Sequence, residues 1–323
     1  MRTLFILLSA AALAGCETLA YYGQAVSGQL ALSASARPVD EALADADPLL
    51  RERLRRAVEI REFAERELSL PSGGAYRSYA DLGRPYALWN VVAAPEFSLE
   101  PVLSCFPIAG CVSYRGYYDK ADAEAHAAER RAAGHDVLVY GVPAYSTLGW
   151  FDDPLLSTFI DYAPEELARL LFHELAHRVV YVKDDSTFNE SFAVAVEREG
   201  LRRWRAAQGL AAQAAPRREE FAALLEATRE TLKALYRSRL APEEMRQRKA
   251  EALTPLAPWL ARMRGFEGAQ PNNAVLAAFA TYTQKLPGFE RLLAEAAGDL
   301  PAFYARVREL ARQPKDARDA VLR

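Results

Sequence analysis

The chain has 323 residues, 51% of them hydrophobic, and a formal net charge of -3. This length can bury one large core or two modest ones. Lys and Arg are spread along the chain rather than gathered into a basic stripe. The composition therefore argues against nucleic acid as the main partner.

The first sixteen residues predict export and a lipid anchor. Arg2 precedes the apolar run 4–13, which is too short to span a membrane. The ending Leu13–Cys16 resembles the bacterial lipobox, in which the Cys becomes the lipidated first residue of the mature protein. An ordinary signal peptide with an incidental Cys is the alternative. We expect a signal peptide over 1–15, lipid on Cys16 and a membrane-tethered soluble body. By analogy with Gram-negative lipoproteins, Glu17 in place of Asp favours the outer membrane, facing the periplasm.

The next segments predict a tether and then one α+β domain over 48–323. Residues 16–47 are rich in Ala, Ser and Gln and are expected to form a tether that packs partly on the body. Residues 48–68 have the apolar spacing of an amphipathic helix. A small mixed sheet is expected over about 85–160, with strands near 87–94, 112–117 and 136–142 and a crossover helix over 122–133.

Cys105 and Cys111 lie within the predicted sheet region, with five residues between them. In an oxidising compartment we expect them to form a disulfide that closes a tight loop. The alternative is a pair of ligands for a second metal, although no further Cys or His partner set lies nearby.

Beyond Pro164 the sequence predicts helix for almost all of the remaining chain. Pro164 suits the first helical position, and acidic residues follow it. Two helices are expected over about 164–207 and a helical region over about 215–312. The individual helices are predicted at 187–208, 215–238, 242–264, 272–285 and 298–312. The fold class is thus α+β, with the helix that begins at Pro164 packed beneath a small mixed sheet.

The chemistry lies in the sequence His173-Glu174-Leu175-Ala176-His177. Two His at i and i+4 share one helix face, so both rings can reach one ion, and Glu174 can take the proton of an attacking water. This H-E-x-x-H pattern is typical of zinc peptidases. A helix that merely happens to place two His four residues apart is the alternative. Apolar residues spread around the same helix favour the metal, because buried His rings need partners.

A third zinc ligand is expected at Glu190, thirteen residues after His177. No His follows His177, which excludes zincins with a third His ligand. Three protein ligands plus water is the usual catalytic zinc set. The alternative is a capping box, in which Glu190 bonds back to the Thr187 amide.

At these residues the chain resembles the family of predicted bacterial zinc-dependent aminopeptidase lipoproteins. The resemblance covers nearly the whole mature chain, and the segments that carry it are 21–25, 28–30, 89–97, 105–111, 114–117, 144–151, 172–177, 188–193, 272–274 and 281–282. It implies a zincin-like fold, Zn²⁺ as cofactor and peptides as substrates.

Several further residues are weaker candidates. Glu96 is a candidate anchor for the substrate's free amine, since zinc aminopeptidases place a Glu after a similar edge strand; the alternative is a solvated Glu after a proline turn. Tyr145 and Tyr282 are candidates to stabilise the oxyanion, or packing residues among the fifteen Tyr of the chain. Arg115 could clamp a peptide carboxylate or pair with an acid. Candidate carboxylates for orienting a ligand His are Asp184, Asp185 and Glu197.

The sequence therefore predicts a zinc-dependent aminopeptidase that removes N-terminal residues from periplasmic peptides. Two alternatives remain at this point. One is an endopeptidase with the same metal chemistry, and the other is a non-catalytic envelope lipoprotein that binds a partner.

Overall fold

The computed structural model describes residues 21–106, 110–147, 151–211 and 216–323. The predicted signal peptide 1–15 and the lipidation residue Cys16 lie outside this part of the chain. Within it, no helix is both long enough and apolar enough to cross a bilayer.

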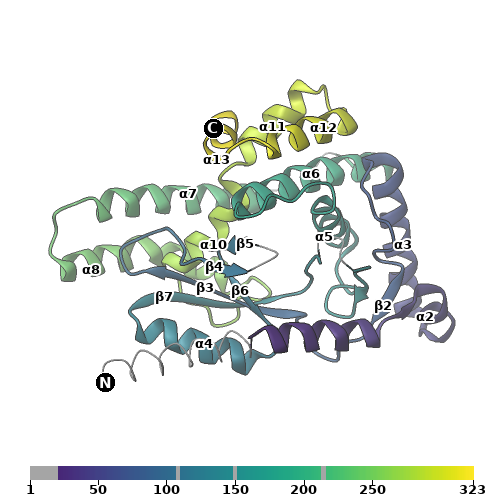
Figure 1. The fold of residues 1–323 in the computed structure, drawn as a ribbon, viewed down its shortest axis with the longest axis horizontal. Coiled ribbons are helices and arrows are strands. Elements are labelled where there is room, and N and C mark those ends of the chain that lie inside the picture. The colour runs from purple at the N-terminus through teal and green to yellow at the C-terminus, as the bar shows by residue number, and fades with distance from the viewer. Residues whose placement is uncertain (1–20, 107–109, 148–150, 212–215) are drawn as a thin grey trace, which may run out of the picture.

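The chain forms small sheets followed by a largely helical region, which confirms the α+β prediction (Figure 1). The strands are β1 (Arg37–Pro38), β2 (Ser78–Ala80), β3 (Leu88–Pro95), β4 (Ser104–Phe106), β5 (Gly110–Val112), β6 (Arg115–Tyr117), β7 (His135–Val142) and β8 (Leu155–Leu156). The helices are α2 (Val39–Asp45), α3 (Pro48–Leu68), α4 (Lys120–Ala132), α5 (Pro164–Ala176), α6 (Ser186–Ala207), α7 (Pro216–Tyr236), α8 (Pro242–Leu253), α9 (Ala257–Leu260), α10 (Asn273–Thr283), α11 (Leu286–Glu295), α12 (Leu300–Ala311) and α13 (Lys315–Val321).

The central sheet has the strand order β6-β3-β7, and both outer strands are antiparallel to β3. β6 and β7 therefore run parallel to each other, and α4 joins them as the predicted crossover helix. Alternate residues of β3 point to opposite faces of the sheet. Val91 and Ala93 pack with α4, whereas Val92 and Ala94 pack with α10.

One detail of the packing differs from the sequence-based expectation. The second face of the central sheet is covered by α10, whereas the His-bearing helix α5 packs mainly on α6 and α3 (Figure 1). α10 is apolar on nearly all sides, and its residues 274–278 are all buried, so it can fill the space between sheet and helices. It carries Tyr282 into the region between the sheet and α5.

The predicted helix 242–264 is broken into pieces. α8 ends at Leu253, a 3₁₀ turn spans Thr254–Leu256, and α9 follows. Pro255 and Pro258 explain the break, because proline lacks the amide hydrogen of a continuing helix and clashes with the preceding turn.

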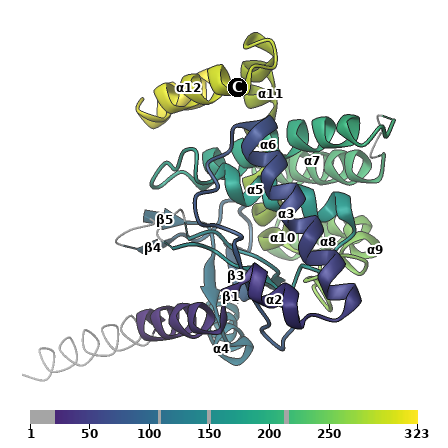
Figure 2. The same ribbon diagram turned by 90° about the vertical axis from the view of Figure 1, so that its right-hand side faces the viewer.

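The N-terminal segment that we expected to be a tether contains regular structure. Residues 21–35 are helical, β1 pairs with β2, and α2 follows (Figure 2). Helix 21–35 is fixed to the body at several points, since Leu32 is buried and Gln24 bonds to the backbone of Gly116 and Tyr118. A Cβ at Gly28 would lie 2.3 Å from the Tyr118 ring, so only glycine permits this close approach.

Candidate metal centre and cavity

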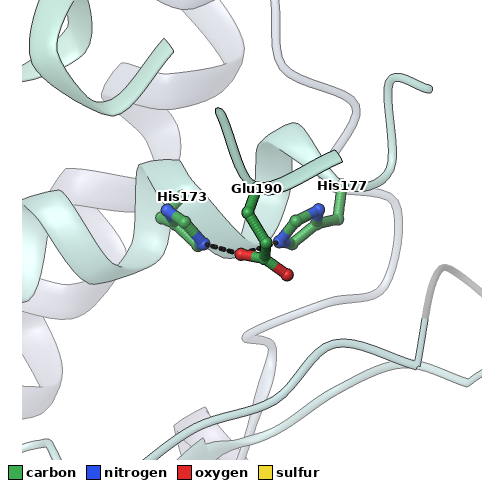
Figure 3. A group of neighbouring side chains, drawn as sticks. All are labelled: His173, His177 and Glu190. Carbon is green, nitrogen blue, oxygen red and sulfur yellow. Dashed lines mark hydrogen bonds and ion pairs between the residues drawn. The ribbon is translucent and has the colours of Figure 1, made fainter. Parts of the chain in front are cut away.

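Two helices bring the predicted zinc ligands together. α5 presents His173 and His177 one turn apart, and α6 presents Glu190 between them (Figure 3). Glu190 Oε2 lies 3.2 Å from His173 Nε2 and 3.6 Å from His177 Nε2. One ligand atom from each residue falls within 4.8 Å of the other two.

The two distances from Glu190 fit a shared zinc ion. Bonds of about 2.1 Å in tetrahedral geometry place neighbouring ligand atoms about 3.4 Å apart. The two distances from Glu190 lie on either side of that value. Two imidazoles and one carboxylate are also a known ligand set of catalytic zinc in peptidases.

The capping alternative for Glu190 is not supported. The N-cap of α6 is Asp185, whose side chain accepts a hydrogen bond from the Phe188 amide. Since another carboxylate caps the helix, Glu190 is left to face the two His rings.

The metal-free cluster has the electrostatics of a buried, charged site. Burial works to raise the pKa of Glu190, but His177 and His173 outweigh it and leave that pKa lowered. Burial opposes charge on His177, yet Glu190 raises its pKa overall. For Glu174 burial dominates, and its pKa is raised even though both His rings act in the opposite direction. A carboxyl with a raised pKa beside the ligands is suited to accepting and releasing a proton.

Of the three carboxylates proposed to orient a ligand, Glu197 does so. Its Oε2 lies 3.1 Å from His173 Nδ1, and its other oxygen is paired with Arg169. Asp184 instead accepts a hydrogen bond from the Cys111 amide. Asp185 forms ion pairs with Lys285 and Arg318. The spacing of Glu197, two turns after Glu190, is consistent with this contact.

The metal cluster opens into a cavity of about 390 Å³. Its wall includes all four residues of the predicted catalytic set, namely His173, Glu174, His177 and Glu190. Helix 21–35 contributes Tyr21, Ala25 and Gln29, and the remaining lining residues are Leu88, Asn90, Phe106, Val112, Tyr114, Gly116, Tyr118, Val142, Ala144, Tyr145, Ser146, Tyr181 and Tyr282. The predicted tether region thus forms part of the wall of the candidate site.

Both oxyanion candidates reach this cavity, but their hydroxyl protons differ in availability. The Tyr145 hydroxyl is bonded to Gln29 Oε1 and lies 2.7 Å from the Tyr118 hydroxyl, which also lies 3.1 Å from Gln29 Oε1. These three oxygens share only two protons. Tyr145 therefore has two acceptors for its proton already in place, Gln29 Oε1 and the Tyr118 hydroxyl.

Tyr282 is better placed to donate. Its ring lies 6.1 Å from that of His173, centroid to centroid. Tyr282 lines the cavity together with the candidate zinc ligands. Tyr140, whose hydroxyl accepts the Asn90 amide at 3.2 Å, is its neighbour. Burial raises the pKa of Tyr282 and keeps this hydroxyl protonated.

Asn90 and Tyr140 were not singled out as site residues from the sequence. They are directly opposed on β3 and β7, on the face that α10 covers. The available signal was the polar Asn90 inside the apolar strand 87–94. A polar residue on a buried strand face needs a partner, and such positions often serve a site.

Two substrate-binding candidates lie elsewhere. Glu96 follows β3 and is 38% exposed, and it is paired with Arg246 at 2.6 Å. It lies six residues beyond Asn90, about 20 Å along an extended strand. It does not line the cavity, so its position does not support a role as amine anchor. Arg115 lies on β6 with its guanidinium 4.1 Å from the Tyr21 ring centroid, and it too is not among the lining residues.

The two cysteines form a disulfide that joins β4 to β5. They are direct partners in the register of this hairpin. Phe106 and Val112, which neighbour the two cysteines, line the cavity. The disulfide therefore fixes one part of the cavity wall.

A family model described as "Putative aminopeptidase" matches residues 20–322. No curated protein and no solved structure matches the chain.

Proposed function

Because this chain belongs to the family described as "Putative aminopeptidase", we propose that it is a zinc-dependent aminopeptidase acting on short peptides. The observation that carries the proposal is the convergence of His173, His177 and Glu190 within 4.8 Å, beside Glu174 and within one cavity. This arrangement supports metal-assisted hydrolysis of a peptide bond.

In this proposal each residue of the site has a separate chemical role. His173, His177 and Glu190 hold the ion, and zinc supplies a Lewis acid that polarises the carbonyl and lowers the pKa of water. Glu174 takes the proton of the attacking water and passes it to the leaving amine nitrogen. Tyr282 donates a hydrogen bond to the developing oxyanion.

The size and walls of the cavity favour peptide ends over the middle of long chains. A volume of about 390 Å³ is at the small end for ligand sites. Helix 21–35 supplies one wall and is held there by Gln24, Gln29 and Leu32. A short peptide end fits a cavity of this size walled in part by this helix.

The test compares zinc content and peptidase rate in four variants. His173→Ala and His177→Ala should lose zinc, because two remaining ligands hold it poorly. Glu190→Gln should weaken zinc binding, whereas a capping residue would change stability only. Glu174→Gln should keep full zinc and lose turnover. A Glu174→Gln variant with full zinc and wild-type turnover would refute the mechanism.

Two substrates distinguish an aminopeptidase from an endopeptidase and from a non-catalytic protein. An aminopeptidase should cleave a peptide with a free amino terminus and not its N-acetyl form. Equal cleavage of both would favour an endopeptidase. No turnover of either by the fully metallated protein would favour a non-catalytic binding role.

We also propose that the protein is an outer-membrane lipoprotein facing the periplasm, anchored through Cys16. The lipobox-like ending at Cys16 supports this placement, and the Cys105–Cys111 disulfide suits an oxidising compartment. Replacing Cys16 with Ser should abolish acyl labelling in cells, and unchanged labelling would refute the anchor.

A further inference from the structure

Helix 21–35 has an outer face without charge. No Asp, Glu, Lys or Arg occurs between Glu17 and Arg37, although 26% of the whole chain is charged. A segment of this length with the average composition of the chain would carry several charged side chains. A helix on the surface of a protein normally presents such residues to water. Their absence here indicates a partner other than water for the outer face.

The outer face is apolar as well as uncharged. Its two large side chains, Val26 and Leu30, are each 59% exposed and lie one helical turn apart. The inner face is different, because Tyr21, Ala25 and Gln29 line the cavity. The helix therefore separates the cavity from whatever contacts Val26 and Leu30. The other exposed residues of the helix are small, namely Gly23, Ser27, Ala31, Ser33, Ala34 and Ser35.

Two of the exposed serines have hydrogen-bond partners within the helix. Ser27 Oγ donates to the Gln24 carbonyl at 3.2 Å, and Ser35 Oγ donates to the Leu32 carbonyl at 2.8 Å. Removing a hydroxyl from water is costly mainly when the hydroxyl has no partner. These serines can therefore enter an apolar environment at little cost.

The helix lies close to the predicted lipid anchor. Cys16, which is outside the described residues, precedes Tyr21 by five positions, a separation of at most about 18 Å in an extended chain. Figures 1 and 2 place helix 21–35 at the edge of the molecule opposite to the C-terminal helices α11, α12 and α13. A lipid on Cys16 would thus bring the start of this helix to the membrane and leave the C-terminal helices away from it.

We propose that Val26 and Leu30 insert into the interfacial layer of the bilayer that holds Cys16, so that helix 21–35 lies along the membrane surface. This inference rests on the proposed lipid anchor. Helices with one apolar face lie in the interface with that face among head groups and acyl chains. A helix standing upright on the membrane would leave Val26 and Leu30 in water. Because the inner face lines the cavity, a flat helix holds the cavity about one helix diameter, about 10 Å, from the bilayer.

The test locates single residues relative to the bilayer. Full-length protein with Val26→Cys is purified from membranes and reconstituted in vesicles of phosphatidylethanolamine and phosphatidylglycerol. With Cys16 acylated and Cys105 bonded to Cys111, the introduced thiol is the only free one, and it is labelled with an environment-sensitive fluorophore. Val321→Cys is the matched control, because this valine is 42% exposed and belongs to the opposite edge of the molecule.

We expect the label at position 26 to shift to the blue and to be quenched by lipids that carry a nitroxide near the head group. The label at position 321 should show neither effect. Adding Leu30→Lys should reduce the quenching at position 26 several-fold, whereas Leu210→Lys, at a residue that is 47% exposed, should not. Both positions are exposed, so neither lysine should alter the thermal midpoint. High salt should leave the quenching unchanged, because the contact contains no charged residue.

Three results would overturn the inference. Equally weak quenching at positions 26 and 321, in protein that sediments with the vesicles through Cys16, would refute it while the lipid anchor stands. A blue shift at position 26 without quenching by the nitroxide lipids would mean that a second copy of the chain covers this face. Wild-type protein that stays free of the vesicles, as Cys16→Ser protein should, would refute the inference together with the anchor.

Discussion

Replacing Glu197 with Gln tests whether this carboxylate orients the zinc ligand His173. Glu197 Oε2 accepts from His173 Nδ1 at 3.1 Å, while its second oxygen is paired with Arg169. The side chain is only 9% exposed, so solvent cannot replace it. A Gln at this position has one acceptor oxygen and no charge, and it cannot satisfy His173 and Arg169 together.

The expected loss of zinc affinity follows from comparable zinc sites. Loss of a carboxylate that holds a ligating His lowers metal affinity about 10- to 100-fold, or about 1.4 to 2.7 kcal/mol. Zinc affinity is measured by competition with a chromophoric chelator. Thermal unfolding of the metal-free protein, measured in parallel, separates an effect on the ligand from an effect on the fold.

Glu199→Gln is a matched control on the same helix. Glu199 lies two residues further along α6, and its partners are Arg202 and Arg203 rather than a His. The same substitution there should leave zinc affinity unchanged. If Glu197→Gln bound zinc as tightly as the wild type, or if both variants lost affinity equally, the assigned role of Glu197 would be wrong.

Three more results are expected. Tyr282→Phe should lower kcat about 100-fold with zinc retained. Tyr145→Phe should have a much smaller effect, because Tyr145 bonds to Gln29 and Tyr118, whereas the Tyr282 ring neighbours that of His173; equal losses would contradict the assignment of Tyr282. Burial favours a raised pKa for Asp185, but its two cationic partners outweigh this and lower the pKa. Its stabilising contribution should therefore be complete above about pH 4 and be lost as the pH falls through the lowered value. Asp185→Asn should cost about 3 kcal/mol at pH 7 in chemical denaturation, and a difference that persisted at pH 2 would refute the assignment. Replacing Cys105 and Cys111 with Ser should lower the free energy of unfolding by about 2 kcal/mol and leave zinc content unchanged, and zinc loss would show that the hairpin supports the metal.

The sequence predicted the parts of this protein that depend on local patterns. Helix 48–68 matches α3, because its boundaries and its apolar face depend on residues within the segment itself. The candidate ligands His173, His177 and Glu190 converge as expected. The i,i+4 spacing places both His rings on one face, and the short connection to the next helix limits where Glu190 can lie. Glu197 could be proposed for the same reason, as its distance from Glu190 along α6 is fixed by helix geometry.

Features that depend on distant contacts were harder to predict. Glu96 was assigned from the resemblance of a short strand end, but that signal does not say at which end of β3 the site lies. The strand register decides this, because Asn90 is opposed to both Tyr140 and Gly116. The register aligns residues far apart in the sequence, and no local pattern encodes it.

Helix 21–35 shows how composition can mislead about position. Its sequence is uncharged and rich in small residues, which suits a tether as well as a packed helix. The small residues instead allow close packing, as at Gly28 against Tyr118, and Gln29 binds two tyrosine hydroxyls at the cavity wall. The segment thus packs on the body, as expected, and in addition supplies part of the cavity wall. If Cys16 carries the lipid, only a few residues separate the membrane anchor from the cavity wall. The length of chain between them then keeps this wall of the cavity close to the membrane.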